Sequence, residues 1–138
     1  MSRYVTFTVE QGLYGVDVQR VQEALRAHDR TRVPLAPEGV AGLVNLRGQV
    51  VLTVDLRPRL GLPPVGDEVQ QMMVVVQVGG ETVSLLVDQV GDVVDVPPER
   101  IEPAPDTLDP TIRPLIQAAC TLDERLLLVL DVDEAAAA

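Results

Sequence analysis

The sequence contains few of the residues that catalyse reactions. It has one histidine, one cysteine, two serines and no lysine. A serine triad would have to combine His28 with Ser2 or Ser84, and a cysteine pair would have to combine it with Cys120. No GxxxxGK[ST] loop, GxGxxG turn or HExxH helix occurs. The composition therefore favours a non-enzymatic role, although 21 acidic residues leave carboxylate pairs possible.

Other scarcities exclude further classes of protein. A single cysteine rules out a disulfide framework and a cysteine-cluster zinc site. The longest apolar runs, Met72–Val76 and Leu126–Leu130, have five residues, against roughly 18 for a membrane span. A net charge of −10 repels phosphate backbones. We expect no membrane insertion and no nucleic-acid partner. The first residues enter strand-like alternation without a signal-peptide pattern, so we expect a cytoplasmic protein.

Valine dominates what is present. The 138 residues suit one domain and include 25 valines but only 2% aromatic residues and no tryptophan. Valine is β-branched and fits the pleated surface of a sheet. Eleven prolines and ten glycines indicate many turns. The composition predicts a mainly β fold.

Local patterns predict hairpins. Apolar residues alternate with polar ones over 5–9 and again over 14–18, on either side of a turn at Gln11-Gly12. A second apolar pair, 72–78 and 83–87, flanks Gly79-Gly80, which suits a two-residue hairpin turn. Between Val18 and Leu25 the apolar spacing loosens toward that of a short helix.

The sequence also contains an internal repeat. Gly15–Val21 aligns with Ser84–Val90, and Asn45–Leu56 aligns with Thr121–Val132 in the same order. Valine-rich chains align with themselves easily, but two segments recurring in order favour two pseudo-repeated β lobes. The Pro- and Gly-rich segment 57–68 is the expected lobe boundary. Aspartates at strand ends are expected to accept hydrogen bonds from turn amides, and these are Asp55, Asp88 and Asp131.

Several segments recur along the chain in a recognisable order. The most specific is Asn45-Leu46-Arg47-Gly48, which runs on to Val54-Asp55-Leu56-Arg57. The remaining segments are Tyr4–Val9, Tyr14–Val18, Val21-Gln22-Glu23, Val87–Val90, Ile101–Pro105 and Leu126–Asp131. Together they resemble the CheW family of chemotaxis coupling proteins. The resemblance covers nearly the whole chain, and its specificity comes from the order and spacing of the segments.

The resemblance implies a fold and a role. It implies a single domain over 1–138, built from two small five-stranded β-barrels with one or two short helices, and a chain that crosses between the lobes. It implies a non-catalytic adaptor, without cofactor or metal, that couples the cytoplasmic tip of a chemoreceptor to the regulatory domain of a CheA-type histidine kinase. The family receives a receptor helix in the hydrophobic cleft between the lobes. The partner-binding residues it implies are Val21, Glu23, Asn45, Arg47 and Gly48.

Alternatives remain at each step. Glu23 and Arg47 could be unrelated exposed charges rather than a functional pair, and Val21 could belong to the core. The adaptor could serve a divergent pathway for motility, pili or development, or act as a decoy that occupies the kinase without a receptor. The chain could also be an excised regulatory domain of a kinase or of a receiver-linked coupling protein. A small carboxylate-based enzyme is less in keeping with its composition.

Overall fold

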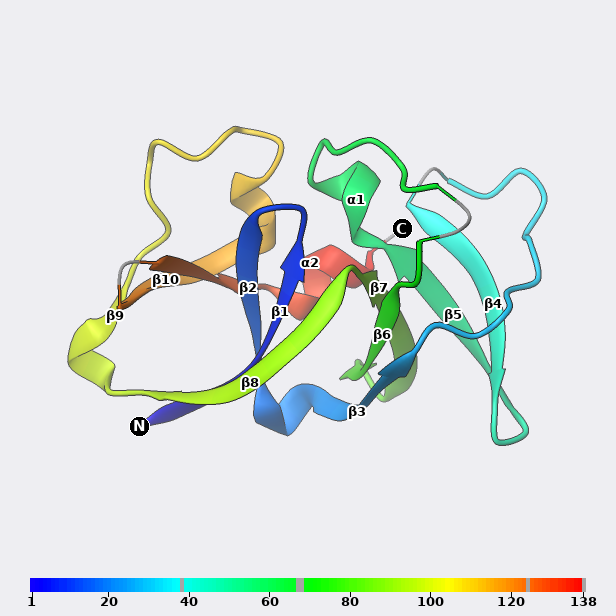
Figure 1. Cartoon of the computed structure of the whole chain (residues 1–138), viewed down its shortest axis with the longest axis horizontal. Coiled ribbons are helices and arrows are strands. Elements are labelled where there is room, and N and C mark those ends of the chain that lie inside the picture. Colours follow the sequence, from blue (N-terminus) through cyan, green and yellow to red (C-terminus); the bar gives the residue numbers. More distant parts are fainter. Residues whose placement is uncertain (38, 67–68, 124, 138) are drawn as a thin grey trace.

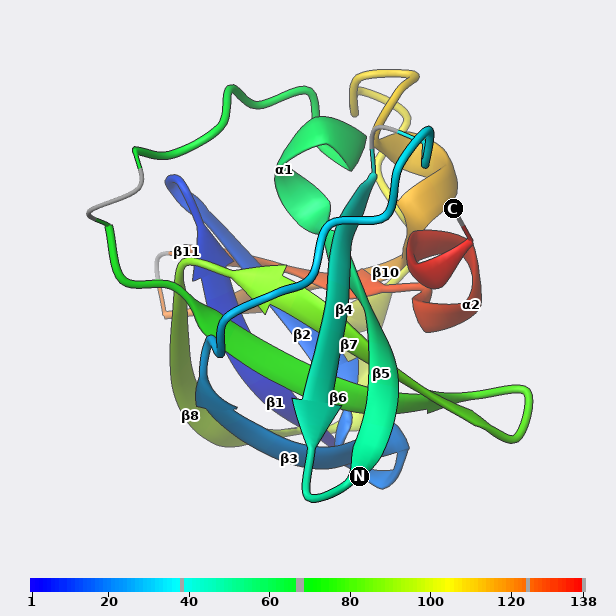
Figure 2. The same ribbon diagram turned by 90° about the vertical axis from the view of Figure 1, so that its right-hand side faces the viewer.

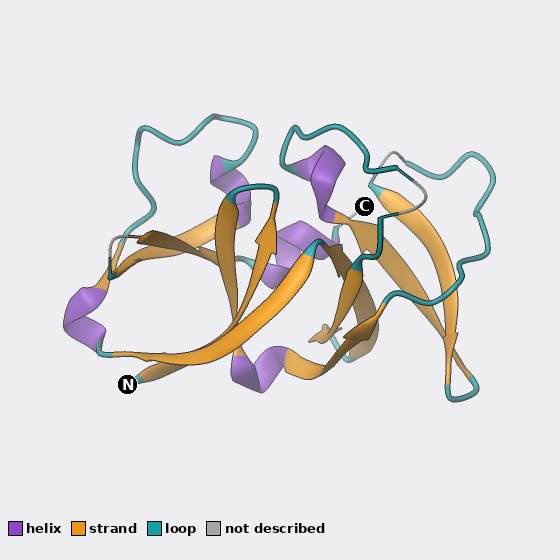
Figure 3. Cartoon of the chain, viewed as in Figure 1, coloured by secondary structure: helices purple, strands orange, loops and turns teal. Residues whose placement is uncertain are grey.

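Strands form wherever β-branched residues recur. The structure is a computed structural model that describes residues 1–37, 39–66, 69–123 and 125–137, and strands dominate it (Figure 3). The strands are β1 (Ser2–Val9), β2 (Gly12–Asp17), β3 (Val21–Arg26), β4 (Val40–Leu46), β5 (Gln49–Asp55), β6 (Met72–Val78), β7 (Glu81–Val87), β8 (Gln89–Val96), β9 (Ile101–Glu102), β10 (Ile116–Leu122) and β11 (Arg125–Leu130). The short helices are α1 (Leu56–Arg59) and α2 (Val132–Ala136), with 3₁₀ turns η1 (Val18–Arg20), η2 (Pro98–Arg100) and η3 (Arg113–Leu115).

The strands make two sheets, which lie side by side in Figure 1. Sheet A has the order β8-β1-β2-β11-β10-β9, and sheet B has the order β3-β6-β7-β5-β4. Both expected hairpins are confirmed. Strands β1 and β2 pair from Tyr4↔Asp17 to Val9↔Gly12, and β6 and β7 pair around Gly79-Gly80, which adopt φ of 57° and 83°.

Apart from the short β9, the strands of the two sheets correspond one to one. Each has an antiparallel hairpin, β1-β2 or β6-β7, joined in parallel to a strand of a second hairpin, β10-β11 or β4-β5. The parallel register places Gly15 beside Val129 and Ser84 beside Thr53. These are the positions that the sequence repeat aligns, and Asp55 and Asp131 are the N-caps of α1 and α2.

Three apolar clusters hold the lobes. One lies within sheet B around Met73 and Leu86, and one within sheet A around Tyr4 and Leu127. The largest cluster draws on both sheets and both helices, and we call it the joint core. Its buried residues are Phe7, Val9, Tyr14, Val16, Val54, Leu56, Leu60, Val74, Val76, Val83, Leu85, Val87, Leu115, Ile116, Leu130, Val132 and Ala135.

The expected lobe boundary was wrong. The described parts of 57–68 lie between β5 and β6, which are both in sheet B. The chain instead crosses between sheets at η1, which follows β2, and at Asp88, which follows β7. Prolines and glycines mark exposed connections, whereas each crossing is short because it runs directly from one strand into the next.

One other expectation needs correction. The segment expected to be a short helix, between Val18 and Leu25, is helical only over η1 and continues as β3. The two expected β lobes are confirmed, sheet B with five strands and sheet A with the short β9 as a sixth strand at its edge. Among the described residues, β3 and β4, the two edge strands of sheet B, pair with β6 and β5 but not with each other. The isolated bridge Thr31↔Leu43 joins β4 to the segment that follows β3.

Candidate functional site

The turn between β4 and β5 presents the Asn45–Gly48 motif. Leu46 pairs with Gln49, so Arg47 and Gly48 form a two-residue turn, with φ of 53° and 85°. Two successive positive φ angles are typical of a type I′ hairpin turn. The amide of Gly48 donates to Asn45 Oδ1 at 2.9 Å, which fixes the turn from within. Asn45 and Gly48 therefore shape the turn that presents Arg47.

Glu23 reaches Arg47 from the opposite edge of sheet B. It lies on β3, whose half-buried face carries Val21, Glu23 and Leu25. The two guanidinium Nη atoms of Arg47 donate to the two carboxylate oxygens, and the Nη2–Oε1 distance is 2.8 Å. In Figure 2 the tip of the β4–β5 hairpin comes down to β3. The Arg47–Glu23 ion pair thus links the two edge strands of sheet B, which do not pair with each other.

The pair is asymmetric in its exposure to solvent. The side chain of Arg47 is 74% exposed and that of Glu23 is 21% exposed. The Arg47 hydrogen bond holds the pKa of Glu23 below its usual value, so this carboxylate keeps its charge further into the acid range. A guanidinium carries five N–H donors, and Glu23 engages one on each Nη atom. The remaining donors leave Arg47 able to contact a second molecule.

Val21 occupies the place where the two sheets meet. It opens β3 directly after the η1 crossing, pairs with Val76 and packs against the joint core. It is half-buried. The structure thus brings Glu23, Asn45, Arg47 and Gly48 together at one end of sheet B and places Val21 at the start of the same strand as Glu23.

Sequence reasoning missed a second charged cluster, centred on Arg57 of α1. Its Nε and Nη2 donate to the two carboxylate oxygens of Asp88 at 3.1 and 2.7 Å, and its Nη1 donates to Glu10 Oε1 and to the Pro63 carbonyl, each at 2.8 Å. The Arg57 side chain is only 5% exposed. Asp88 also accepts from the Glu10 amide at 2.7 Å. Asp88 was expected to accept a hydrogen bond from a turn amide, and it does so, but the amide belongs to a turn 78 residues away in the sequence.

No sequence pattern identifies these partners, because Arg57 lies 47 residues from Glu10 and 31 from Asp88. The available signal was the absence of lysine. With 11 arginines as the only strong bases among 21 acids, an arginine directly after a strand was a candidate for a buried ion pair.

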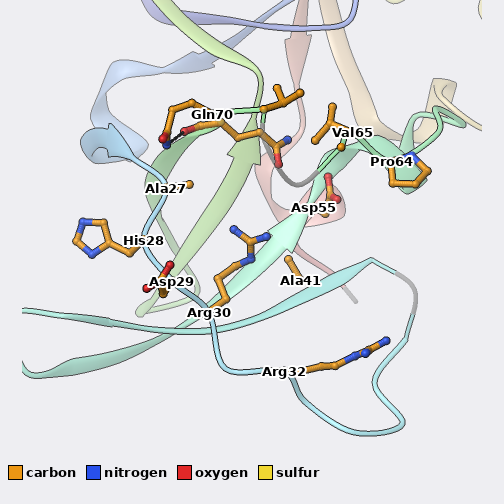
Figure 4. A pocket seen from close by; sticks show the side chains of 13 residues that line it. Ala27, His28, Asp29, Arg30, Arg32, Ala41, Asp55, Pro64, Val65 and Gln70 are labelled. Carbon is orange, nitrogen blue, oxygen red and sulfur yellow. Dashed lines mark hydrogen bonds between the residues drawn. The ribbon is translucent and has the colours of Figure 1, made fainter.

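A polar pocket of about 600 Å³ opens between the loop after β3 and the described residues before β6. Figure 4 shows Arg30 extending into it toward Asp55, while the ring of His28 points away. Burial raises the pKa of Asp55, and the Arg57 amide and the Arg30 charge oppose this rise. Ser84 is fully buried in β7. His28 is exposed.

The described residues form neither a membrane-spanning helix nor a cluster of metal ligands. No helix among them combines the length and the hydropathy that crossing a membrane requires. No group of three or more histidine, cysteine, aspartate or glutamate side chains among them is arranged to hold a metal ion.

Comparison with known proteins gives consistent matches. The model of the CheW-like domain matches residues 3–138. The chain is 31% identical over 132 residues to the chemotaxis protein CheW of Klebsiella aerogenes, covering 95% of this chain and 79% of that protein. It is 28% identical to the chemotaxis protein CheW of Bacillus subtilis, covering 95% of this chain and 84% of that protein.

A solved structure matches the fold as well. The scaffolding protein TtCheW from Thermoanaerobacter tengcongensis superposes with a TM-score of 0.85 at 27% identity, covering 95% of this chain and 84% of that one. Members of the family are scaffolds without enzymatic activity. With its paired β lobes, its Asn45–Gly48 hairpin and these matches, the chain belongs to the CheW family of chemotaxis scaffold proteins.

Proposed function

We propose that the protein couples chemoreceptors to a CheA-type histidine kinase by binding both, with the Arg47 hairpin as part of the contact surface. The observation that carries the proposal is the exposed, preorganised Arg47–Glu23 pair, held at the Asn45–Gly48 turn of a chain that matches the CheW-like domain over residues 3–138. Because the partners act in the cytoplasm, we place the protein there.

The physics of such a contact follows from the surface. Val50 is the cross-strand neighbour of Asn45 and is 65% exposed, so an apolar side chain stands next to the Arg47 turn. Apolar contact area supplies affinity in an interface, and charges at its rim set orientation and association rate. Glu23 holds the Arg47 side chain in one geometry, which lowers the entropy lost when a partner binds. Val21 would contribute where the lobes meet.

Binding of the purified protein to the regulatory domain of the CheA-type kinase and to the receptor tip from the same organism tests the proposal. We expect Arg47→Glu to weaken at least one of these interactions about tenfold or more. The substitution places a second acid beside Glu23 and removes the positive charge that would face an acidic group on the partner. Arg26→Glu is the matched control, since Arg26 is exposed on β3 and the change in net charge is the same.

A third variant distinguishes the need for an ion pair from the need for a positive charge at position 47. The swap Glu23→Arg with Arg47→Glu restores an ion pair but reverses its exposed charge, so binding should stay weak. Full binding by Arg47→Glu in a folded sample would refute the role of Arg47. Failure of the unmodified protein to bind any CheA-type kinase of the organism would refute the coupling function itself.

A further inference from the structure

The two lobes are linked by covalent crossings, by apolar packing and by ionic contacts. The crossings are η1 and Asp88, and the apolar contact is the joint core. Apolar burial stabilises the contact but is not directional. Cores built of aliphatic residues also tolerate repacking with small loss of stability. The joint core therefore holds the lobes together without by itself specifying one angle between them.

Arg57 supplies directional contacts at this junction. It lies on α1, which follows β5 of sheet B. Glu10 lies in the β1–β2 turn of sheet A, and Asp88 is the residue at which the chain passes from β7 to β8. One guanidinium thus joins sheet B, sheet A and the crossing between them.

The geometry of the guanidinium restricts how these parts move. A planar fork bound to both oxygens of a carboxylate allows little rotation or sliding. Nη1 of Arg57 is bound at the same time to Glu10 and to the Pro63 carbonyl. A change in the angle between the lobes would separate Glu10 from Arg57 and take one of two ionic partners away from a buried guanidinium, which is costly.

Other arginines add links around the same junction. Arg20 of η1 donates to the Gln77 carbonyl of sheet B at 3.0 Å and to Asp133 of α2 at 2.7 Å. Arg59 of α1 donates to the Glu134 carbonyl of α2 at 2.7 Å. These side chains are more exposed than that of Arg57. Arg57 is the link with the strongest geometric restraint.

We propose that Arg57 is a positioning residue, which holds the two lobes at the single mutual orientation needed for receptor-dependent control of the kinase. The second half of this statement rests on the proposed function. Being 5% exposed, the Arg57 side chain has almost no surface with which to touch a partner, so its effect on signalling would be indirect.

The orientation can be measured without any partner. Spin labels at Ala24→Cys on β3 and Gln117→Cys on β10 span the two sheets, and labels at Val93→Cys on β8 and Gln117→Cys lie within sheet A. Cys120 is 1% exposed and stays unlabelled. We expect Arg57→Lys to broaden the distance distribution between the sheets and to leave the distribution within sheet A unchanged. Lysine keeps the charge but lacks the fork.

Two further variants keep the test decisive. Arg113→Lys alters an ion pair with Asp106 inside one connection and should change neither distribution. If Arg57→Lys does not fold, Glu10→Ala removes only the sheet A side chain from the cluster, because the Glu10 side chain is 46% exposed and the Arg57–Asp88 pair remains. An unchanged, narrow distribution between the sheets in a folded variant would overturn the proposal.

The consequence for signalling is measured separately. We expect Arg57→Lys to bind the kinase regulatory domain within about twofold of the unmodified protein, because a side chain that is 5% exposed has almost no surface to touch the kinase. We expect the same variant to lose receptor-dependent kinase activation. Normal activation despite a broadened distance would refute the link to signalling. If the unmodified protein binds neither partner, the proposed function fails, and the distance measurement alone decides whether Arg57 holds the lobes.

Discussion

At the scale of single residues, arginine carries the directional contacts of this protein. Arg47 and Arg57 each donate hydrogen bonds from two nitrogen atoms to one carboxylate. The Arg47 side chain is 74% exposed, whereas the Arg57 side chain is 5% exposed. The exposed fork can serve a partner, and the buried one serves the fold. With no lysine in the chain, every strongly basic contact is made by a rigid guanidinium.

The Arg57–Asp88 pair predicts a pH dependence of stability. Burial alone would raise the pKa of Asp88, but the hydrogen bonds from Arg57 and from the Glu10 amide hold it below its usual value. A lowered pKa stabilises the folded state above the unfolded value of about 3.9, and this stabilisation disappears as the pH falls through the folded pKa. We expect Arg57→Met to cost about 3 kcal/mol at pH 7 and progressively less in acid.

Urea unfolding of the unmodified protein and of Arg57→Met between pH 7 and pH 3 measures this difference. Arg113→Met, which removes an exposed pair with Asp106, is the control and should cost little at any pH. A cost for Arg57→Met that stays constant as the pH falls would show that the side chain contributes packing rather than charge.

At the scale of elements, hairpins were predictable and β3 was not. Gly79-Gly80 between two apolar runs predicts a tight hairpin turn, and the structure has that turn between β6 and β7. The half-buried face of β3 consists of Val21, Glu23 and Leu25. A glutamate in the middle interrupts the apolar alternation, because it is stabilised there by Arg47 from a distant turn. Glu23, which we propose is functional, is thus the residue that makes β3 hard to predict from the sequence.

The repeated N-caps also belong to this scale. The Asp131 carboxylate accepts from the Glu134 amide at the start of α2, as Asp55 accepts from the Arg57 amide at the start of α1. We expect Asp131→Ala to lower the free energy of unfolding by about 1 kcal/mol, measured by urea titration. Asp131→Asn keeps a capping oxygen and should lose much less. An equal loss in both variants would mean that the charge matters and the cap does not.

At the scale of the whole molecule, the joint core makes two lobes into one unit. Leu85 and Leu86 are neighbours on β7 and both are buried, but Leu85 faces the joint core and Leu86 the core within sheet B. They allow the coupling between the lobes to be tested with one pair of matched substitutions.

We expect Leu85→Ala to cost about 2–5 kcal/mol and to lower amide hydrogen-exchange protection in both sheets. Leu86→Ala should lower protection in sheet B more than in sheet A, because the contacts it removes lie within sheet B. Exchange measured by NMR distinguishes the two patterns. A loss confined to sheet B in Leu85→Ala would show that the lobes unfold independently.

Much of this protein was determined by its sequence alone. Valine content predicts a β fold, since β-branched side chains favour strands. Glycine pairs mark hairpins, and the repeat aligns Gly15 with Ser84 in the register that the sheets adopt. The Asn45–Gly48 motif indicates the family, and only through that resemblance does Glu23 become the expected partner of Arg47. The strand, turn, repeat and motif patterns are local or recur in order, so they can be read without knowing the fold.

Only the tertiary structure decided where the lobes divide and what joins them. The chain leaves sheet B at Asp88, a position with no proline, whereas the described part of the Pro-rich stretch, residues 57–66, follows a strand of sheet B. Arg57 meets Glu10 and Asp88 only because the two crossings bring three distant segments together. Sequence patterns report local conformation, whereas contacts between lobes depend on how complete sheets pack, and no short stretch of sequence encodes that packing.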